Sequence, residues 1–140
     1  MKLGLTILLC AVVLLTAAAA ENARVTYVGH DKVVKGGTVV TASDLTVLMM
    51  HRAAPGEVEI HDRETDTFYV RDGEATLVTG GKMLDGRVTA PNQKRGKNIS
   101  GGEVHRLSKG DVIVIPAGIP HWFKEVPRSI DYYVVKVLKP

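Results

Sequence analysis

The stretch that decides the fold reads Gly110-Asp111-Val112-Ile113-Val114-Ile115-Pro116-Ala117-Gly118-Ile119-Pro120-His121. Its run of β-branched residues predicts a short strand over 111–115, because such side chains pack well on a pleated surface. The segment Ser108-Lys109-Gly110 before that strand, and the prolines and glycine behind it, are typical of turns. A second short strand is expected over 121–123, so the stretch predicts two strands with a histidine at the start of the second.

The same pattern continues on both sides of this stretch and predicts an all-β chain. Short β-branched runs are broken by Gly, Pro, Asn and Asp, and no segment has a convincing helical period. The predicted strands are 25–28, 33–34, 39–41, 45–51, 58–61, 67–71, 74–79, 111–115, 121–123 and 130–137. Many short antiparallel strands favour a sandwich or a barrel, and closure into a barrel removes exposed sheet edges.

Two connections carry more specific predictions. Asp72-Gly73 lies between two apolar runs and predicts a hairpin with a two-residue type I′ turn, which needs positive φ at both positions. Between Leu84 and Glu103 the strand pattern fails and polar, glycine-rich sequence takes over. Loops of that length in a compact domain are usually functional or mobile, so a lid over a barrel mouth and a tolerated insertion both remain open.

The segment Glu57-Val58-Glu59-Ile60-His61 places two polar side chains on one strand face. Alternate residues of a strand point to opposite faces, so Glu59 and His61 share one face while Val58 and Ile60 share the other. Taken alone, this segment is typical of an edge strand with its polar face in water. The residues that follow it change that interpretation.

After His61 come four residues, Asp66, six residues and Gly73, which resembles the first cupin motif of His-x-His, three or four residues, Glu, six residues and Gly. The stretch from Gly110 to His121 resembles the second cupin motif, with the key Gly, Pro and His residues in register. The resemblance covers about 55–125, with motif 1 at about 55–73, an intermotif loop at about 80–109 and motif 2 at about 110–125. It implies a single-domain cupin-type β-barrel, also described as a jelly roll or double-stranded β-helix.

The chain departs from the cupin pattern at three positions: Glu59 replaces the first histidine, Asp66 replaces glutamate, and Glu125 stands where the second motif often ends in asparagine. Carried over by position, the metal ligands implied by the resemblance are Glu59, His61, Asp66 and His121. Imidazole and carboxylate suit Mn, Fe, Ni or Zn, and the extra carboxylate favours harder ions such as Mn(II) or Fe(II). The alternative is a barrel that has lost its metal and binds small molecules without one.

Strand alternation also predicts what surrounds these side chains. His121 and Phe123 should face one way and Trp122 the other, and Asp66 shares its face with Phe68 and Val70. We therefore expect a pocket wall of Met49, Phe68 and Phe123. His51 lies near a strand end, where it either lines the barrel mouth or is hydrogen-bonded or exposed, and the two remaining histidines, His30 and His105, are expected to be solvated beside turns.

The N-terminus has the layout of a signal peptide. Lys2 is followed by an apolar run that ends in small residues before Glu21, and this predicts a leader over 1–20 with a mature domain over 21–140. An uncleaved membrane anchor is the alternative. The predicted location is therefore periplasmic or secreted, with no stable membrane anchor after cleavage. The only cysteine, Cys10, leaves with the leader, so the mature chain is expected to form no disulfide.

Charge excludes one class of partner and leaves the function class open. The formal charge of +3 falls to +2 without Lys2, and a short basic run at 94–97 is explained by a solvated loop, so no nucleic-acid partner is expected.

One interpretation of the function is a metal-dependent enzyme that acts on a small organic molecule, either an oxidoreductase such as a dioxygenase or an isomerase, with catalytic residues unknown. The others are a non-catalytic module that binds or senses a small molecule, and a stable scaffold. A homodimer formed through N-terminal strands is one possible assembly.

Overall fold

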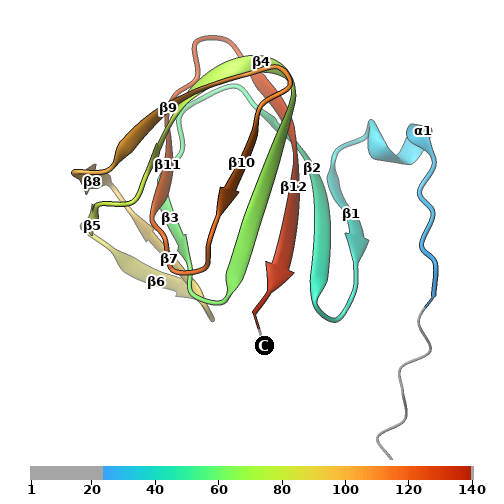
Figure 1. Cartoon of the computed structure of the whole chain (residues 1–140), viewed down its shortest axis with the longest axis horizontal. Helices are drawn as coiled ribbons and strands as arrows, with labels where there is room; N and C mark the ends of the chain where they lie inside the picture. Colours follow the sequence, from blue (N-terminus) through green and yellow to red (C-terminus); the bar gives the residue numbers. More distant parts are fainter. Residues whose placement is uncertain (1–23, 140) are drawn as a thin grey trace, which may run out of the picture.

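The structure, a computed structural model, describes residues 24–139 as a curled antiparallel β-sheet with one short helix (Figure 1). The elements in chain order are α1 His30–Val33, β1 Gly37–Thr41, β2 Leu45–Arg52, β3 Val58–His61, β4 Glu64–Thr79, β5 Lys82–Leu84, β6 Arg87–Ala90, β7 Gln93–Gly96, β8 Asn98–Ser100, β9 Glu103–Ser108, β10 Val112–Ile115, β11 His121–Glu125 and β12 Ile130–Leu138. The predicted all-β barrel of jelly-roll type is confirmed. No helix within 24–139 has the length and apolar character needed to span a bilayer.

The long strand β4 joins two facing layers. Its first half pairs with β10 and β12, and β12 continues the layer to β2 and β1. Its second half pairs with β9 and β11, and β11 continues through β3 and β7 to β6. The space between the two layers holds the core and, at one end, the polar side chains of the candidate site.

Inward side chains of both layers form the core. It consists of Phe68, Val70, Ala75, Leu77, Leu107, Ile115, Phe123, Ile130, Tyr132 and Val134. Phe68 stacks on Phe123 with ring centroids 5.7 Å apart, and Tyr132 lies within 5.3 Å of both rings. Aromatic rings in such offset and tilted arrangements add to the free energy gained by burial, and they form the floor of the cavity described below.

The hairpin predicted at Asp72-Gly73 is wrong. Only Gly73 has a positive φ, 78°, and the chain continues as one bent strand that stays paired with β12 through Gly73 and Ile130. A Cβ atom at position 73 would lie 2.1 Å from the carbonyl oxygen of Ser129. The glycine therefore permits a close backbone approach at the bend rather than a reversal, a second common role of glycine in strands.

The long loop predicted between Leu84 and Glu103 is also wrong. The segment forms the β6–β7 hairpin, with Asn92 in the left-handed region at its turn, and β8, which pairs with β5. Because much of this hairpin faces solvent or the cavity, its sequence lacks the apolar alternation by which strands are predicted. β7 pairs with β3, so the hairpin forms one wall of the site.

The predicted strands at 25–28 and 33–34 are wrong, since 25–28 has no regular structure and Val33 ends α1. The remaining predicted strands correspond to β1, β2, β3, the two halves of β4, β10, β11 and β12. The predicted leader over 1–20 lies outside the described residues.

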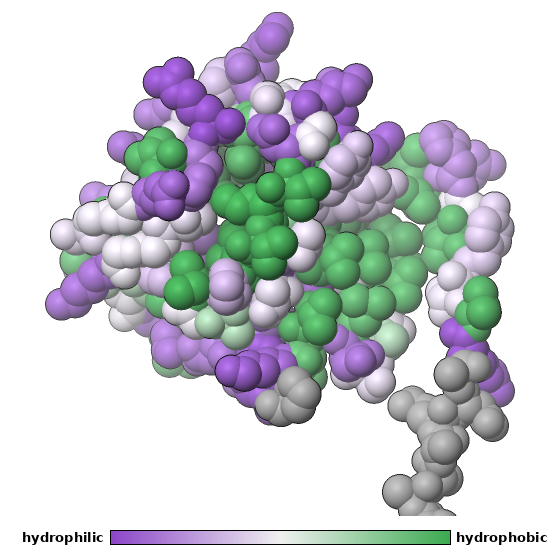
Figure 2. Space-filling view, viewed as in Figure 1, coloured by the Kyte–Doolittle hydropathy of each residue, from purple (hydrophilic) through white to green (hydrophobic). Residues whose placement is uncertain are grey.

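The outer face of the layer formed by β10, β4 and β12 carries exposed apolar side chains (Figure 2). Val112 and Val114 on β10 are 60% and 57% exposed, and Tyr69 on β4, paired with Val112, is 47% exposed. We call these three residues the outer apolar patch. It lies on the face of the layer opposite the core.

Candidate metal centre

Three strands bring the four predicted ligand residues to one end of the barrel. Glu59 and His61 lie on β3, Asp66 on the first half of β4, and His121 at the start of β11, where it pairs directly with Glu59. His61, Asp66 and His121 are buried, and they are the three polar residues buried within the described chain. The interpretation of Glu59 and His61 as a water-facing edge is therefore excluded for His61, while Glu59 stays partly exposed at the cavity.

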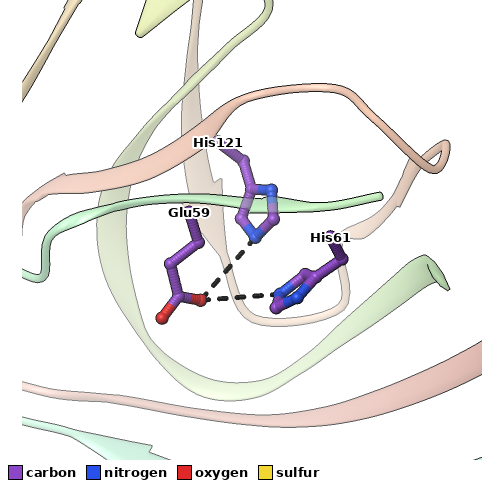
Figure 3. Close-up of side chains that lie close together, drawn as sticks. All are labelled: Glu59, His61 and His121. Carbon is purple, nitrogen blue, oxygen red and sulfur yellow. Dashed lines mark ion pairs between the residues drawn. The ribbon is translucent and has the colours of Figure 1, made fainter. Parts of the chain in front are cut away.

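The donor atoms of these residues converge. In Figure 3 one carboxylate oxygen of Glu59 faces both imidazoles: Oε2 lies 3.7 Å from Nε2 of His61 and 3.8 Å from Nε2 of His121. Oδ2 of Asp66 lies 3.5 Å and 3.9 Å from the same two nitrogens. A metal ion bonded to such donors at about 2.0–2.2 Å keeps neighbouring donors roughly 3–4 Å apart. The observed spacing has this size.

A hydrogen bond to the backbone fixes His121 in the tautomer that a metal ligand requires. Its Nδ1 lies 3.2 Å from the carbonyl oxygen of Ile119, and because a carbonyl only accepts, Nδ1 carries the proton. Nε2 is then an acceptor; it is buried and has no hydrogen-bond partner. Fixing a ligand histidine through its other nitrogen is the usual outer-sphere arrangement of metal sites. Burial lowers the pKa of His121, although the charges of Asp66 and Glu59 oppose this, so the ring is neutral at neutral pH.

Each site carboxylate also has a cationic partner. Nζ of Lys136, on β12, lies 2.8 Å from both oxygens of Asp66, and Nη2 of Arg95, on β7, lies 2.7 Å from Oε1 of Glu59. Burial alone would raise the pKa of Glu59, but the polar contact with His61 and the positive charge of Arg95 lower it to about 2. The protein itself therefore supplies a cationic partner for each of the two inward carboxylates.

The cluster opens into a cavity of about 260 Å³ between the two layers. Besides the four predicted ligands, its lining includes Arg52, Phe68, Gln93, Arg95, Phe123, Tyr132 and Lys136. Phe68 and Phe123 are confirmed as wall residues, and Asp66, His121 and Phe123 face inward as the alternation predicts. Met49 is wrong as a wall residue because the alternation of β2 places its neighbours Leu48 and Met50 at the cavity instead.

The remaining histidines lie elsewhere. His51 is exposed and bonds Asp131 through Nδ1 at 2.7 Å, and His105 bonds the hydroxyl of Thr79 at 2.8 Å. Trp122 faces away from the cavity residues of β11 and donates its Nε1–H to the carbonyl of Gly56. None of these side chains lines the cavity.

The three cationic residues of the cavity lining were not predicted from the sequence. Lys136 shares the alternation of Tyr132 and Val134, so its inward direction was readable from the strand pattern of β12. Arg52 continues the alternation of Leu48 and Met50. To predict that it faces the cavity, one must know which of the two faces of β2 points inward. Arg95 lies on a strand that the sequence did not predict, and no local pattern indicated its contact with Glu59.

A jelly-roll barrel with histidines and carboxylates converging at one end defines the class of the protein. A family profile described as Cupin matches residues 19–136, and the chain belongs to the cupin family. Members of this family commonly bind a divalent metal and small-molecule ligands or substrates. A search among curated proteins gave no match.

Solved structures with the same fold share little sequence with this chain. BH2720 from Bacillus halodurans has a TM-score of 0.59 and 19% identity, covering 86% of each chain. KdgF from Halomonas sp. has a TM-score of 0.54 and 20% identity, covering 75% of this chain and 80% of its own. An iron(II) form of HppE has a TM-score of 0.53 and 14% identity, covering 72% of this chain and 49% of its own. These similarities concern the fold alone.

Proposed function

We propose that this cupin binds one divalent metal ion through Glu59, His61, Asp66 and His121 and acts as a metal-dependent enzyme on a small organic molecule. The observation that carries the proposal is the buried Nε2 of His121, which has its lone pair directed to the cluster and no partner. A buried acceptor without a partner costs free energy, and coordination to a metal ion would remove that cost.

Two imidazoles and a carboxylate with open positions suit Fe(II) or Mn(II). Glu59, His61 and His121 have donor atoms within 4.8 Å of one another, so they are the ligands of first choice. Both oxygens of Asp66 already accept hydrogen bonds from Lys136. Asp66 therefore completes the ligand set by sharing its Oδ2 between Lys136 and the ion.

When bound, the ion supplies Lewis acidity at positions left open by the protein. The remaining cavity residues define the environment of a substrate. Arg95 helps to keep Glu59 ionised, and Lys136 holds both oxygens of Asp66. The hydroxyl of Tyr132, whose pKa burial raises against the effect of Arg52, stays protonated and able to donate a hydrogen bond. The apolar floor of Phe68 and Phe123 limits the water around a bound molecule.

The second candidate function is a non-catalytic module that binds or senses a small molecule. The observation in its favour is the charge balance of the cluster, in which Arg95 and Lys136 already neutralise both carboxylates without an ion. The two functions differ in whether turnover of a substrate disappears on chelation or ligands only stabilise the fold.

Metal analysis tests the proposal first. The mature chain, purified without a histidine tag, should carry close to one equivalent of Mn or Fe by plasma mass spectrometry. His61→Ala and His121→Ala should lose it, because each removes a buried donor. His51→Ala is the matched control, since His51 bonds Asp131 on the surface and should leave the metal content unchanged. A wild-type protein that stays metal-free after reconstitution with Mn(II), Fe(II), Ni(II) and Zn(II) would overturn the proposal.

We also propose that the chain is exported after loss of residues 1–20 and that the mature protein forms a homodimer through its N-terminal strand β1. Support for export comes from the sequence of the leader. The dimer is supported by the position of β1 at the end of the strand order, where its outer edge has no neighbour among the described strands.

A further inference from the structure

Within residues 24–139, two buried side-chain nitrogen or oxygen atoms lack a hydrogen-bond partner, and both belong to residues that line the same cavity. One is Nε2 of His121, which the proposed metal explains. The other is Nε of Arg52, at the end of β2, and no part of the metal centre accounts for it. Buried polar atoms are nearly always paired in folded proteins, so this second atom requires its own explanation.

Arg52 differs from the other cations of the cavity. Arg95 is paired with Glu59 and Lys136 with Asp66, whereas Arg52 forms no ion pair with any carboxylate of the described chain. The cavity wall therefore has three cationic side chains against two carboxylates. Arg95 also lies 3.8 Å from Glu57 and Lys136 3.5 Å from Glu64, so Arg52 is the one of these three cations without a carboxylate partner in the described chain.

The guanidinium of Arg52 is held in place by Phe123, Tyr132 and Gly56 rather than by an anion. Its Cζ lies 4.8 Å from the centre of the Phe123 ring, in a cation–π arrangement. On another side, a Cβ atom added at Gly56 would come within 2.7 Å of Nη1, so the glycine leaves the space that the guanidinium uses. A group fixed in this way loses little conformational entropy when it binds a ligand.

We propose that Arg52 is an anchor that binds a carboxylate group of the small-molecule substrate. A guanidinium presents its N–H groups in a planar fork that matches a carboxylate, and such charge-assisted pairs are among the strong hydrogen-bonded contacts of proteins. No carboxylate of the described chain balances the charge of Arg52, and one monoanionic group on a ligand would do so. This inference rests on the proposed function for the ligand's role as substrate, but the binding itself requires only the cavity.

The test uses lactate and lactamide, which have the same shape and differ in charge, as probes of the mature protein. The Nε–H resonances of the arginines are followed by ¹⁵N NMR during titration, in metal-free and in zinc-loaded protein. We expect lactate to shift one Nε–H resonance, assigned by its absence in Arg52→Lys, with saturation in the millimolar range. Lactamide should leave that resonance in place.

Arg52→Met removes the charge but keeps an unbranched side chain over Phe123, and we expect it to bind lactate about tenfold more weakly or worse. Arg71→Met is the matched control, because Arg71 stacks on Tyr133 with Cζ 5.5 Å from the ring centre and does not line the cavity. It should bind lactate as the wild type does. The lactate and lactamide comparison in the wild type decides the question even if Arg52→Met fails to fold.

Equal binding of lactate and lactamide, undiminished binding by Arg52→Met, or no saturable shift at tens of millimolar would each overturn the anchor. Tighter binding of inorganic phosphate than of lactate would overturn the assignment to a carboxylate. The metal content of Arg52→Met should equal that of the wild type. A protein that binds lactate through Arg52 but never binds metal would refute the proposed metal centre and leave the anchor standing.

Discussion

Lys136 projects from the inner face of β12, and its ammonium group lies against Asp66, whose side chain is 3% exposed. A buried carboxylate that loses its cationic partner is strongly destabilising, by about 3–5 kcal/mol in other proteins. Lys136→Met should therefore lower the stability of the metal-free protein by about 3 kcal/mol. It should also enlarge the stabilisation by Mn(II), because both oxygens of Asp66 become free to ligate.

Denaturant unfolding with and without Mn(II) measures both effects. Lys94→Met is the matched control: the Lys94–Asp62 pair has the same kind of contact at 2.7 Å, but its side chains are 42% and 38% exposed. Exposed pairs contribute about 0–1 kcal/mol, so this variant should change little. Equal losses in the two variants, or a smaller response to Mn(II) in Lys136→Met, would contradict the role given to Lys136.

At the scale of single residues, the motif spacing placed His61, Asp66 and His121 correctly in the interior, because each lies on a strand whose alternation is clear. The partners of the carboxylates were not predictable in the same way. Arg95 meets Glu59 only because β7 pairs with β3 in one register, and register between distant strands has no local sequence pattern. Whether the four residues hold a metal stays a prediction.

Among the elements, β4 depends most on one residue. Gly73 has a φ of 78° and approaches Ser129 so closely that a Cβ atom would lie 2.1 Å from its carbonyl oxygen. Gly73→Ala should therefore cost about 3 kcal/mol or more, since both the backbone conformation and the contact are violated. Gly110→Ala is the matched control: Gly110 has a φ of 94° with no atom within 4 Å, so only the conformational cost of about 1–2 kcal/mol applies.

Thermal unfolding of the two variants separates these costs. If Gly110→Ala were as destabilising as Gly73→Ala, the close approach to Ser129 would contribute nothing to the loss of stability, and the positive φ alone would explain it. Because β4 carries Asp66 and contributes to both layers, we expect the Gly73 variant also to weaken metal binding, whereas the Gly110 variant should not.

The elements that sequence patterns predicted correctly are those with one buried and one exposed face. β10 and β11 show this alternation, and the turn residues between them stand where the second motif requires them. β6 and β7 have no such face, so their polar sequence was taken for a loop. The bend at Gly73 was taken for a hairpin because a glycine in a tight turn and a glycine at a close backbone approach look the same in sequence.

For the whole molecule, we expect the uncovered edge of the curled sheet at β1 to determine the oligomeric state. β1 ends the strand order, and an uncovered edge offers unpaired N–H and C=O groups to a second chain. Its pairing with β2 shifts register between Thr38 and Val40, which marks Val39 as the extra residue of a bulge. Pairing through β1 would place two copies side by side and leave both cavities intact.

Size-exclusion chromatography with light scattering, at two concentrations of the mature chain, should give twice the monomer mass at the higher one. Val39→Pro should shift the protein to monomer, because proline at an edge removes a donor without disturbing the interior. Val114→Lys, in the outer apolar patch, is the control for association through that face and should stay dimeric. A monomer at both concentrations would refute the dimer, and a monomer produced only by Val114→Lys would move the contact from the β1 edge to the outer apolar patch.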